Sequence, residues 1–389
     1  MKIALVREKY TDFGGAERYL ANLAEHLLMS GHEVHIFAHE WNSRGITGSK
    51  GSRFHVHKVP VITGLSVLRV ISFAVNVRRL LKQEQFDIIH SFERTFYQDV
   101  YRAGDGCHRE WLVQRRKTER WYKTIINSIN PLHWALLRIE REIFRTGNYR
   151  IIIAISKRGK EEIVRHYKVP REKIKVIYNA IDTNRFNFND RIKTRAEVRK
   201  TIGIPEDTPL LIFVGSGFRR KGLSAAIRAL ARLETKVSLM VIGKDSADSY
   251  RLLAKKVGVE KRVFFIGPVV DVEKYYCASD LFIFPTVYEP FGNVCLEAMA
   301  AGLPIVTSRI CGGSEVLDEG KNGYVIEDPT DCKEIAYKIQ MGLKLEPECV
   351  RNFNMQKLRE HSWDVYLEQL SAIYKEICKK SFDEEFQNI

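Results

Sequence analysis

Two glutamates eight residues apart, Glu289 and Glu297, mark the segment of the chain with the clearest capacity for chemistry. The loop that contains Glu289 follows an apolar run, and Gly292 or Asn293 can cap a helix that continues through Ala301. We therefore expect Glu297 in the first helical turn, with free backbone N–H groups between the two carboxylates. Such N–H groups bind phosphate, and carboxylates accept hydrogen bonds from the hydroxyls of a sugar cis-diol. The alternative is that Glu297 only compensates the helix dipole and that Glu289 is a surface residue.

A second segment places cations where a helix is expected to start. The apolar run 210–214 is followed by a glycine-containing turn, then by Arg219, Arg220 and Lys221, and then by apolar residues at helical spacing. Cations at a helix N-terminus are unfavourable because they oppose the helix dipole. A bound anion such as a diphosphate would explain their presence there. A solvated basic turn is the alternative. The dinucleotide fingerprint is absent, because Arg220 stands where its third glycine belongs, and the chain has no Walker lysine motif.

Two glycine pairs also follow apolar runs. Gly14 and Gly15 lie after the first expected strand and allow close approach of a ligand to the backbone. Gly312 and Gly313 can form a backbone nest for an anion. An ordinary tight turn explains Gly14 and Gly15 equally well, and for Gly312 and Gly313 it is the favoured interpretation.

The elements that position these segments follow an α/β pattern. Short apolar runs alternate with helical patterns in two successive blocks, which predicts two doubly wound, Rossmann-like domains joined near residues 182–187. Ligands of such sheets bind beyond the carboxyl ends of the strands, and we expect the site in the cleft between the domains. The expected strands are 3–6, 34–38, 54–59, 87–90 and 151–155 in the first domain and 210–214, 237–242, 263–265, 281–284 and 305–307 in the second.

Composition excludes several classes of protein. The chain has 389 residues, of which 45% are hydrophobic and 28% charged, as is typical of globular domains. No stretch approaches the roughly 18 apolar residues that cross a membrane, and the first residues are too few for the apolar core of a secretory signal. The seven cysteines form no C-x-x-C pair, so we expect free thiols in the cytoplasm.

The net charge of +14 is concentrated in the first half of the chain. Residues 1–190 carry 33 Lys and Arg against 20 Asp and Glu, whereas residues 191–389 carry 29 against 28. This asymmetry indicates an anionic partner for the first half: nucleic acid, an acidic membrane surface or a phosphorylated substrate.

Taken together, these segments resemble the retaining, nucleotide-sugar-dependent glycosyltransferases of family 4, which have the GT-B fold. The strongest match is the Glu289–Glu297 segment with its continuation Ala-Met-Ala-x-Gly-x-Pro through Pro304. Further matches, which extend the resemblance over nearly the whole chain, are Gly14-Gly15, 177–182 and 312–315.

One departure from the family pattern points to a subgroup. Ser216 stands where most members have an arginine, and the arginines are at 219 and 220. The sequence 214–222 looks like the version found in lipopolysaccharide core glucosyltransferases of the heptose α-1,3-glucosyltransferase type, as does 103–107. The resemblance therefore implies transfer of a hexose, glucose from UDP-glucose, to a phosphorylated or lipid-linked glycan such as a lipopolysaccharide core.

The resemblance also assigns roles. A first domain over residues 1–180 binds the acceptor, a second over 190–360 binds the nucleotide sugar, and a C-terminal helix at about 363–380 packs back on the first. Arg220 and Lys221 bind the donor diphosphate, Glu297 the ribose hydroxyls and Glu289 the transferred hexose. The catalytic set so implied is Glu289, Lys221, Asp105 and His108, the last two on the acceptor side, and the donor-binding set is Gly14, Gly15, Arg220, Lys221, Glu289, Phe291, Gly292, Asn293, Val294 and Glu297. We expect no metal and no cofactor, because Mg²⁺ would need carboxylates around the diphosphate where this chain supplies cations.

A basic aromatic segment, 109–145, holds nine Lys and Arg and the tryptophans Trp111, Trp121 and Trp134. Tryptophan and arginine together suit the headgroup region of an anionic membrane, so we expect the protein on the cytoplasmic face of the cell membrane. Alternatively the tryptophans are core residues of a helical insertion. No recognition motif for nucleic acid is present, and we expect no nucleic-acid partner. The rival functions are a non-catalytic sugar- or membrane-binding relative and a nucleic-acid-binding protein.

Overall fold

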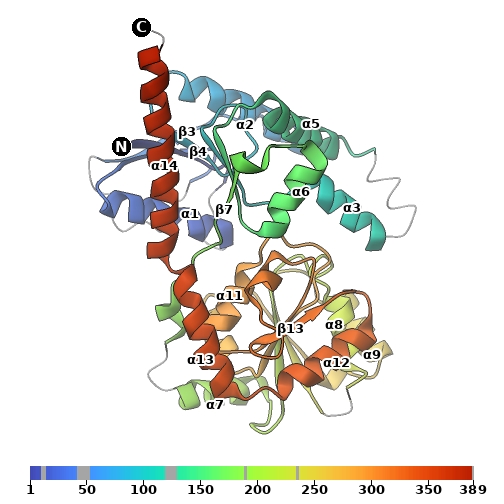
Figure 1. Ribbon diagram of the computed structural model, residues 1–389. Coiled ribbons are helices and arrows are strands. Elements are labelled where there is room, and N and C mark those ends of the chain that lie inside the picture. The colour runs from blue at the N-terminus through green and yellow to red at the C-terminus, as the bar shows by residue number, and fades with distance from the viewer. Residues whose placement is uncertain (10–14, 42–52, 119–128, 188–190, 234–235, 388–389) are drawn as a thin grey trace. The chain divides into compact units, whose positions relative to one another are not determined.

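The chain divides into two compact units in the computed structural model, which describes residues 1–9, 15–41, 53–118, 129–187, 191–233 and 236–387. Unit 1 comprises Met1–Ile177 and Leu367–Ile389, and unit 2 comprises Tyr178–Tyr366. Each unit is built on its own parallel sheet (Figure 1). The stretch 182–187 carries a short 3₁₀ turn, η3 (Thr183–Phe186), within unit 2. The doubly wound α/β class predicted from the sequence is confirmed.

The sheet of unit 1 has seven strands in the order β3-β2-β1-β4-β5-β6-β7. All its pairings are parallel, and the central strands are buried on both faces, which is why they are almost purely apolar. The strand order reverses between β1 and β4, and the carboxyl ends of these two strands form the point where such a sheet binds ligands. The strands are β1 (Lys2–Val6), β2 (Glu33–Ala38), β3 (Phe54–Lys58), β4 (Ile88–Ser91), β5 (Val100–Ala103), β6 (Ile151–Ala154) and β7 (Ile174–Val176).

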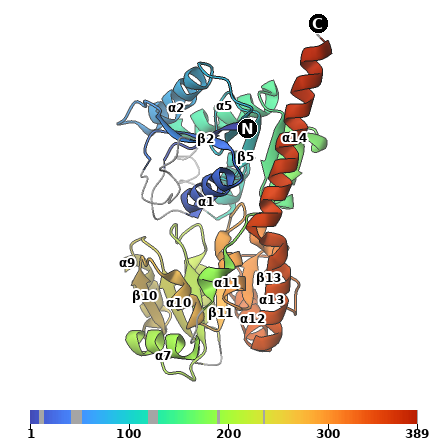
Figure 2. The ribbon, with the colours of Figure 1, turned by 90° about the vertical axis from the view of Figure 1, so that its left-hand side faces the viewer.

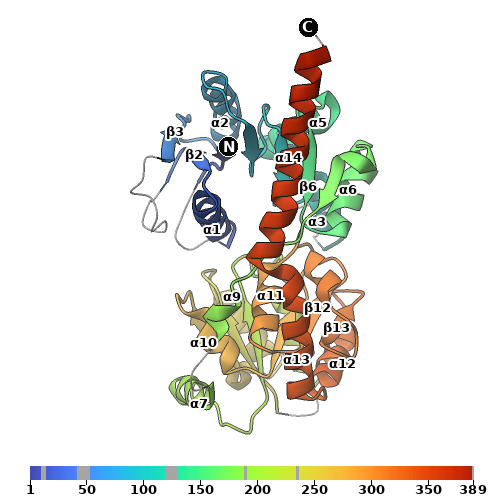
Figure 3. The ribbon, with the colours of Figure 1, turned by 60° about the vertical axis from the view of Figure 1, so that its left-hand side comes forward.

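Helices cover both faces of this sheet. On one face Phe73 and Val77 of α2 pack with Val6 and Ile89. His90, the next residue along β4, points to the opposite face, where its Nδ1 lies 2.7 Å from the hydroxyl of Tyr374 in α14. Figures 2 and 3 show α14 along that face, and Figure 1 shows α2 beside α5. The helices are α1 (Gly15–Met29), α2 (Ser66–Leu81), α3 (His108–Thr118), α5 (Pro131–Thr146), α6 (Lys157–Tyr167) and α14 (Trp363–Gln387).

The sheet of unit 2 has six parallel strands in the order β10-β9-β8-β11-β12-β13. Its order reverses between β8 and β11, which are paired neighbours although 66 residues of chain lie between the last residue of β8, Val214, and the first residue of β11, Leu281. The strands are β8 (Leu210–Val214), β9 (Ser238–Ile242), β10 (Val263–Gly267), β11 (Leu281–Phe284), β12 (Ile305–Ser308) and β13 (Gly323–Ile326).

The helices of unit 2 also lie in two layers, with α8 against α9 and α12 on one face and α11 against α13 on the other (Figure 1). They are α7 (Arg191–Ile202), α8 (Leu223–Leu230), α9 (Asp248–Lys256), α10 (Val272–Cys277), α11 (Asn293–Ala300), α12 (Cys332–Leu343) and α13 (Pro347–Leu358). None of the helices in the described part of the chain is both long and apolar enough to cross a membrane.

Three strands were not expected from the sequence: β5, β7 and β13. Each has only three or four residues, and each contains a polar residue or a glycine that interrupts the apolar pattern. Their positions in the sheets come from long-range pairing with β6 or β12, which a local pattern does not show.

Candidate active site

Both segments that the sequence singled out in the second half of the chain lie at the reversal point of the unit 2 sheet. The glycine turn with Arg220 and Lys221 follows β8, and the loop with Glu289 follows β11. Because β8 and β11 are paired side by side, the two loops leave adjacent carboxyl ends. In doubly wound sheets this is the position where a nucleotide binds.

Arg220 and Glu289 are bonded to each other. Arg220 Nη1 donates to Glu289 Oε2 over 2.6 Å and to the backbone oxygen of Tyr288 over 2.9 Å. The backbone oxygen of Arg220 in turn accepts from the amide of Val287 and the hydroxyl of Thr286, at 2.9 and 3.0 Å. The two loops are therefore hydrogen-bonded to each other and present a cation and a carboxylate together.

Lys221 lies beside this pair. Its Nζ is 5.2 Å from the centre of the Phe284 ring, and its side chain fills the space where Gly215 has no Cβ. Burial lowers the pKa of Lys221, and the carboxylates of Glu289 and Glu297 oppose that effect. Because the ammonium group of such a lysine is poorly hydrated, a bound anion stabilises its charged form strongly.

A glycine makes this approach of the loops possible. Gly222 has φ +81°, and a Cβ at this position would lie 1.9 Å from the backbone oxygen of Pro285. Only glycine allows the turn after β8 to contact the loop after β11 so closely.

Helix α11 starts at one of the two caps expected from the sequence, but Glu297 does not lie in its first turn. Its N-cap is Gly292, its first residue is Asn293, and its first turn contains no acid. Glu297 therefore lies in the second turn, and the reading of this residue as a first-turn acid that compensates the dipole is wrong. Its Oε2 accepts a hydrogen bond from the hydroxyl of Tyr276 at 3.1 Å. Tyr276 is fully buried and thereby orients a half-buried carboxylate.

The other residues predicted to bind the donor surround the start of α11. Phe291 is buried against the ring of Tyr178, the side-chain amide of Asn179 donates to Asn293, and Val294 is half buried. The structure thus brings together Arg220, Lys221, Glu289, Phe291, Gly292, Asn293, Val294 and Glu297.

Two groups of backbone amides have partners that the sequence did not reveal. The N–H groups of Gly312 and Gly313 donate to the backbone oxygens of Glu289 and Phe291, so they support the Glu289 loop and do not form an anion nest. After β8, the amides of Gly217 and Phe218 donate to the carboxylate of Asp245 at 2.8–3.0 Å. The anionic partner of this glycine turn is a side chain of the protein itself, and the cations of Arg220 and Lys221 are the groups left for a ligand.

Unit 1 contains the residues predicted for the acceptor side. Asp105 is half exposed in the turn between β5 and α3, with its oxygens 3.9 Å from Arg7 and 3.7 Å from Arg94. His108 is the first residue of α3, and its ring contacts those of Trp111 and His133. Burial and the Arg94 charge lower the pKa of His108 to about 3. His108 is therefore neutral at physiological pH and poorly suited to act as a general base.

Sequence reasoning missed the two glutamates that organise this region. Glu140 is fully buried, and its carboxylate accepts from the amide of His108 at 2.8 Å and from Arg94 at 3.4 Å, which fixes the start of α3. Glu93 lies just beyond β4, with Oε1 3.3 Å from Arg7 at the end of β1, so it occupies the reversal point of the unit 1 sheet. Burial raises the pKa of Glu93 to about 7. A carboxyl group with such a pKa at a ligand-binding edge is a candidate functional residue.

Of the glycine pair predicted in unit 1, Gly15 begins α1, and Gly14 lies outside the described residues.

The basic aromatic segment has two tryptophans in described positions, and they differ. Trp111 is half buried, its ring contacts those of His108 and His133, and Arg115 lies over its ring at 4.9 Å. Trp134 in α5 is 67% exposed. Trp121 lies outside the described residues.

Comparisons with known proteins agree with this architecture. The model of the family "Glycosyltransferase Family 4" matches residues 13–185, and that of "Glycosyl transferases group 1" matches residues 194–356. The chain is 28% identical over 352 residues to the lipopolysaccharide glucosyltransferase WaaG of Escherichia coli, a match that covers 89% of this chain and 91% of WaaG.

Solved structures show the same fold. The crystal structure of a WaaG glycosyltransferase involved in lipopolysaccharide biosynthesis superimposes with a TM-score of 0.77 at 26% identity, over 95% of this chain and 98% of that one. The structure of HepE from Anabaena in complex with UDP-glucose gives a TM-score of 0.73 at 19% identity, over 98% and 100% of the two chains.

The two family matches lie one on each unit, and the matched segments include the paired loops of Arg220 and Glu289. The chain therefore belongs to the GT-B glycosyltransferases of group 1 and family 4, and it is a nucleotide-sugar-dependent glycosyltransferase.

Proposed function

We propose that this enzyme transfers a hexose, with retention of anomeric configuration, from UDP-glucose to a hydroxyl of a membrane-bound glycan such as a lipopolysaccharide core. The observation that carries the proposal is the Arg220–Glu289 ion pair beside Lys221 at the reversal point of the unit 2 sheet. The similarity to WaaG over most of both chains supports glucose and a lipopolysaccharide-type acceptor as the first substrates to test.

On the donor side, the diphosphate meets Arg220 and Lys221. Negative charge grows on the diphosphate as the glycosidic bond breaks, and two cations held by the surrounding protein stabilise that charge without reorganising. Glu297, oriented by Tyr276, accepts hydrogen bonds from the ribose hydroxyls. Glu289 accepts hydrogen bonds from hydroxyls of the hexose once Arg220 has turned to the diphosphate.

Retention follows from attack on the same face that the leaving group departs from. In this route the departing phosphate oxygen takes the proton of the acceptor hydroxyl, and the transition state has oxocarbenium character. On the acceptor side, Asp105 and neutral His108 serve as hydrogen-bonding groups that position the acceptor. Neither needs to change its protonation state during the step.

The reaction, in this proposal, needs no divalent metal. Arg220 and Lys221 supply the positive charge at the diphosphate that Mg²⁺ supplies where carboxylates hold it. Activity should persist in excess EDTA, and a loss that Mg²⁺ or Mn²⁺ restores would refute this part of the proposal.

The direct test is a screen of nucleotide sugars. UDP-glucose should protect the protein against thermal unfolding, since a ligand at 100 times its dissociation constant adds about 2.7 kcal/mol to the free energy of unfolding. UDP-galactose, GDP-mannose and ADP-glucose are the comparison donors. With a lipopolysaccharide acceptor truncated after the heptoses, the product linkage determined by NMR should be α. A β-linked product would refute retention, and preference for another donor would refute glucose transfer from UDP.

We further propose that unit 1 attaches the enzyme to the anionic cytoplasmic leaflet. The exposed side chains of α5 include Trp134, Arg138, Arg141 and Arg145, whose spacing of four, three and four residues places them on one helix face. The opposite face carries the buried residues Ile139 and Ile143. A stripe of arginines with a tryptophan at its end suits a phospholipid headgroup layer, where each basic residue contributes about 1 kcal/mol.

Vesicle sedimentation tests the attachment. The protein should bind anionic vesicles at low salt and be largely released at 1 M salt, where the Debye length falls to about 3 Å. Replacing Arg138, Arg141 and Arg145 by Gln should abolish the salt-sensitive binding and leave turnover of a soluble acceptor unchanged. Binding equal to the parent would refute the role of this stripe.

A further inference from the structure

Three histidines and two glutamates gather at the edge of the unit 1 sheet, on residues that have no part in the proposed transfer. Glu33 and His35 alternate along β2 and therefore point to the same face. The parallel register places His55 of the edge strand β3 directly beside His35. His57 follows two residues later on β3, and Glu84 comes from the segment after α2.

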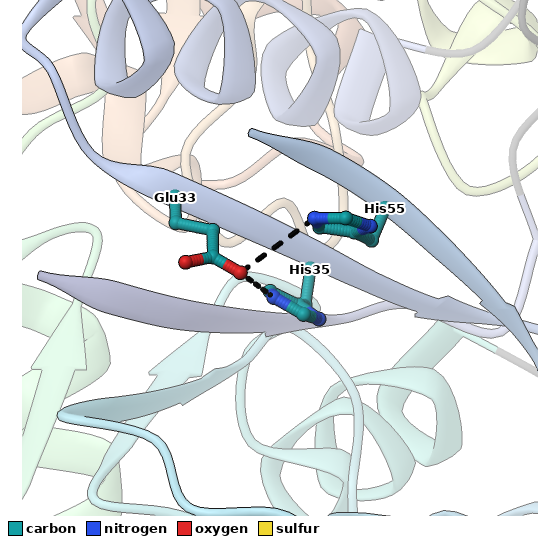
Figure 4. Close-up of side chains that lie close together, drawn as sticks. All are labelled: Glu33, His35 and His55. Carbon is teal, nitrogen blue, oxygen red and sulfur yellow. Dashed lines mark hydrogen bonds and ion pairs between the residues drawn. The ribbon is translucent and has the colours of Figure 1, made fainter. Parts of the chain in front are cut away.

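Within this group, three ligand atoms converge. Glu33 Oε1 lies 2.8 Å from His35 Nε2 and 3.6 Å from His55 Nε2, as the close-up shows (Figure 4). All three atoms lie within 4.8 Å of one another.

We propose that Glu33, His35 and His55 form a binding site for a divalent transition metal, with Zn²⁺ as the reference ion. Zinc ligands of these types lie about 2.0–2.2 Å from the metal, so tetrahedral geometry separates two ligand atoms by roughly 3.3 Å. The two separations given above lie on either side of that value. Two imidazoles and one carboxylate leave a fourth coordination position for water. Imidazole nitrogen binds Zn²⁺, Ni²⁺ and Cu²⁺ in preference to Mg²⁺.

The neighbours of His35 fix the orientation of its ring, as a metal ligand requires. Its side chain is only 4% exposed, and its ring stacks on that of His55 with centres 4.5 Å apart. Its other nitrogen, Nδ1, lies 2.8 Å from His57 Nε2. With a metal on Nε2, the Nδ1–H of His35 donates to His57, which fixes the tautomer of the ligand. His57 itself is oriented by stacking on Phe37.

A second triad, His35 Nδ1 with His57 and Glu84, is less suitable. Glu84 Oε1 is bonded to the ammonium of Lys2 at 2.6 Å, and its other oxygen is 4.0 Å from His35 Nδ1. The fixed positive charge of Lys2 repels a metal ion beside Glu84. Glu33 and His55 are 40% and 42% exposed, so an ion in solution can reach them.

A metal at this site connects β2 to the edge strand β3. Ligands on two adjacent strands hold the edge in register, in addition to the backbone hydrogen bonds. The role we infer is stabilisation of unit 1, separate from sugar transfer.

The test uses full-length, tag-free protein stripped of metal with a chelator. Titration with Co²⁺, followed by its visible absorption, and with Zn²⁺, followed by calorimetry, should show one equivalent bound, and Zn²⁺ should raise the midpoint of thermal unfolding. His55→Gln should weaken binding by more than about 100-fold, since even partners of metal ligands change affinity by about 10- to 100-fold. His26→Gln in α1 and Glu84→Gln are the controls and should bind like the parent.

Because His55 is half exposed, its variant should fold, and the unfolding midpoint without metal checks this. Glu33→Gln provides an independent second variant with the same expected loss. The proposal is overturned if the parent binds no metal, if both variants bind like the parent, or if Glu84→Gln loses binding while His55→Gln keeps it. In the first case the group is a hydrogen-bonded row of histidines only.

Discussion

Replacing Lys221 by methionine should lower the turnover number by about 10²–10³-fold while leaving the protein folded. Methionine retains an unbranched apolar stem, so it can occupy the space beside Gly215 and the Phe284 ring that Lys221 fills. The change removes only the ammonium charge. Because burial already lowers the pKa of Lys221, that charge lies in a poorly hydrated position, where one preorganised stabiliser of developing charge contributes about 2.7–4 kcal/mol.

The assay is the steady-state rate of UDP release at saturating donor and acceptor, and thermal unfolding checks the fold. Lys244→Met is the matched control, since Lys244 is an exposed lysine whose backbone amide lies 3.3 Å from Ser216 Oγ in the turn after β8. This control should keep the parent turnover. A Lys221→Met enzyme with unchanged turnover would show that the ammonium has no part in catalysis.

The same lysine should limit activity at alkaline pH. A lysine whose pKa is lowered by burial loses its proton at a lower pH than an ordinary lysine. As the pH is raised, kcat/KM should therefore decrease with a midpoint at a pH lower than 10.5, the ordinary pKa of lysine. The bound diphosphate stabilises the charged form, and the corresponding limb of kcat should lie at higher pH. Coincident limbs would contradict contact between Lys221 and the diphosphate.

Three other perturbations test neighbouring features. Glu297→Gln should weaken binding of both UDP and UDP-sugar, whereas Glu289→Gln should spare UDP and impair transfer; calorimetry and turnover distinguish them, and equal losses of UDP affinity would reverse the assignment. Gly222→Ala should destabilise unit 2 far more than Gly203→Ala, because both glycines have positive φ but only a Cβ at 222 meets the Pro285 oxygen; similar changes in denaturant midpoint would contradict the contact. Glu93→Gln should stabilise the protein increasingly as the pH rises from about 4.5 to 7, because the parent loses stability over that interval when a carboxyl group has its pKa raised to about 7 in the folded state. The gain in the free energy of unfolding is at most about 3 kcal/mol, at 1.4 kcal/mol for each pKa unit. Denaturant melts in which the difference between variant and parent stays constant with pH would refute this prediction.

The sequence was sufficient to single out the residues proposed for the donor side because each belongs to a contiguous segment next to a strand. Glu289 and Arg220 are 69 residues apart, yet each follows an apolar run, and parallel strands bring their carboxyl ends together. The α/β alternation was sufficient to place both segments at one edge of a sheet. Their direct ion pair was not predictable, because it depends on the close contact of Gly222 with Pro285.

Asp245 and Glu140 could not be found in the same way. Each is an isolated acid without a motif, and its role depends on a partner distant in sequence. Asp245 binds the amides of Gly217 and Phe218, 27 and 28 residues away, and Glu140 binds the amide of His108, 32 residues away. One available signal was the position of Glu93 directly after an expected strand at residues 87–90, the same signal that identified Glu289.

The position of Glu297 shows the limit of reading a helix start from residue types. Either Gly292 or Asn293 was a possible cap, and with Gly292 as the cap the fifth helical residue is Glu297. A side chain one turn further along is too distant to compensate the helix terminus, since that effect is confined to the first turn. Dipole compensation therefore does not explain why the half-buried Glu297 is an acid. The feature that remains to be explained is its hydrogen bond to Tyr276.

The ion pair between Arg220 and Glu289 suggests why both residues suit a site that binds and releases its donor. An arginine 34% exposed and a carboxylate 16% exposed stabilise each other at 2.6 Å, so neither charge lacks a partner before the donor arrives. A pair this accessible to water contributes little net free energy, so exchanging the carboxylate for a diphosphate carries a small penalty. A diphosphate has more negative charge than one carboxylate, which favours the exchange for Arg220. In the proposed mechanism, the exchange also releases Glu289 from Arg220, so that its carboxylate can accept hydrogen bonds from the hexose. Binding of the diphosphate and preparation of the sugar contact are therefore the same rearrangement, and a sugar without a diphosphate should not produce it.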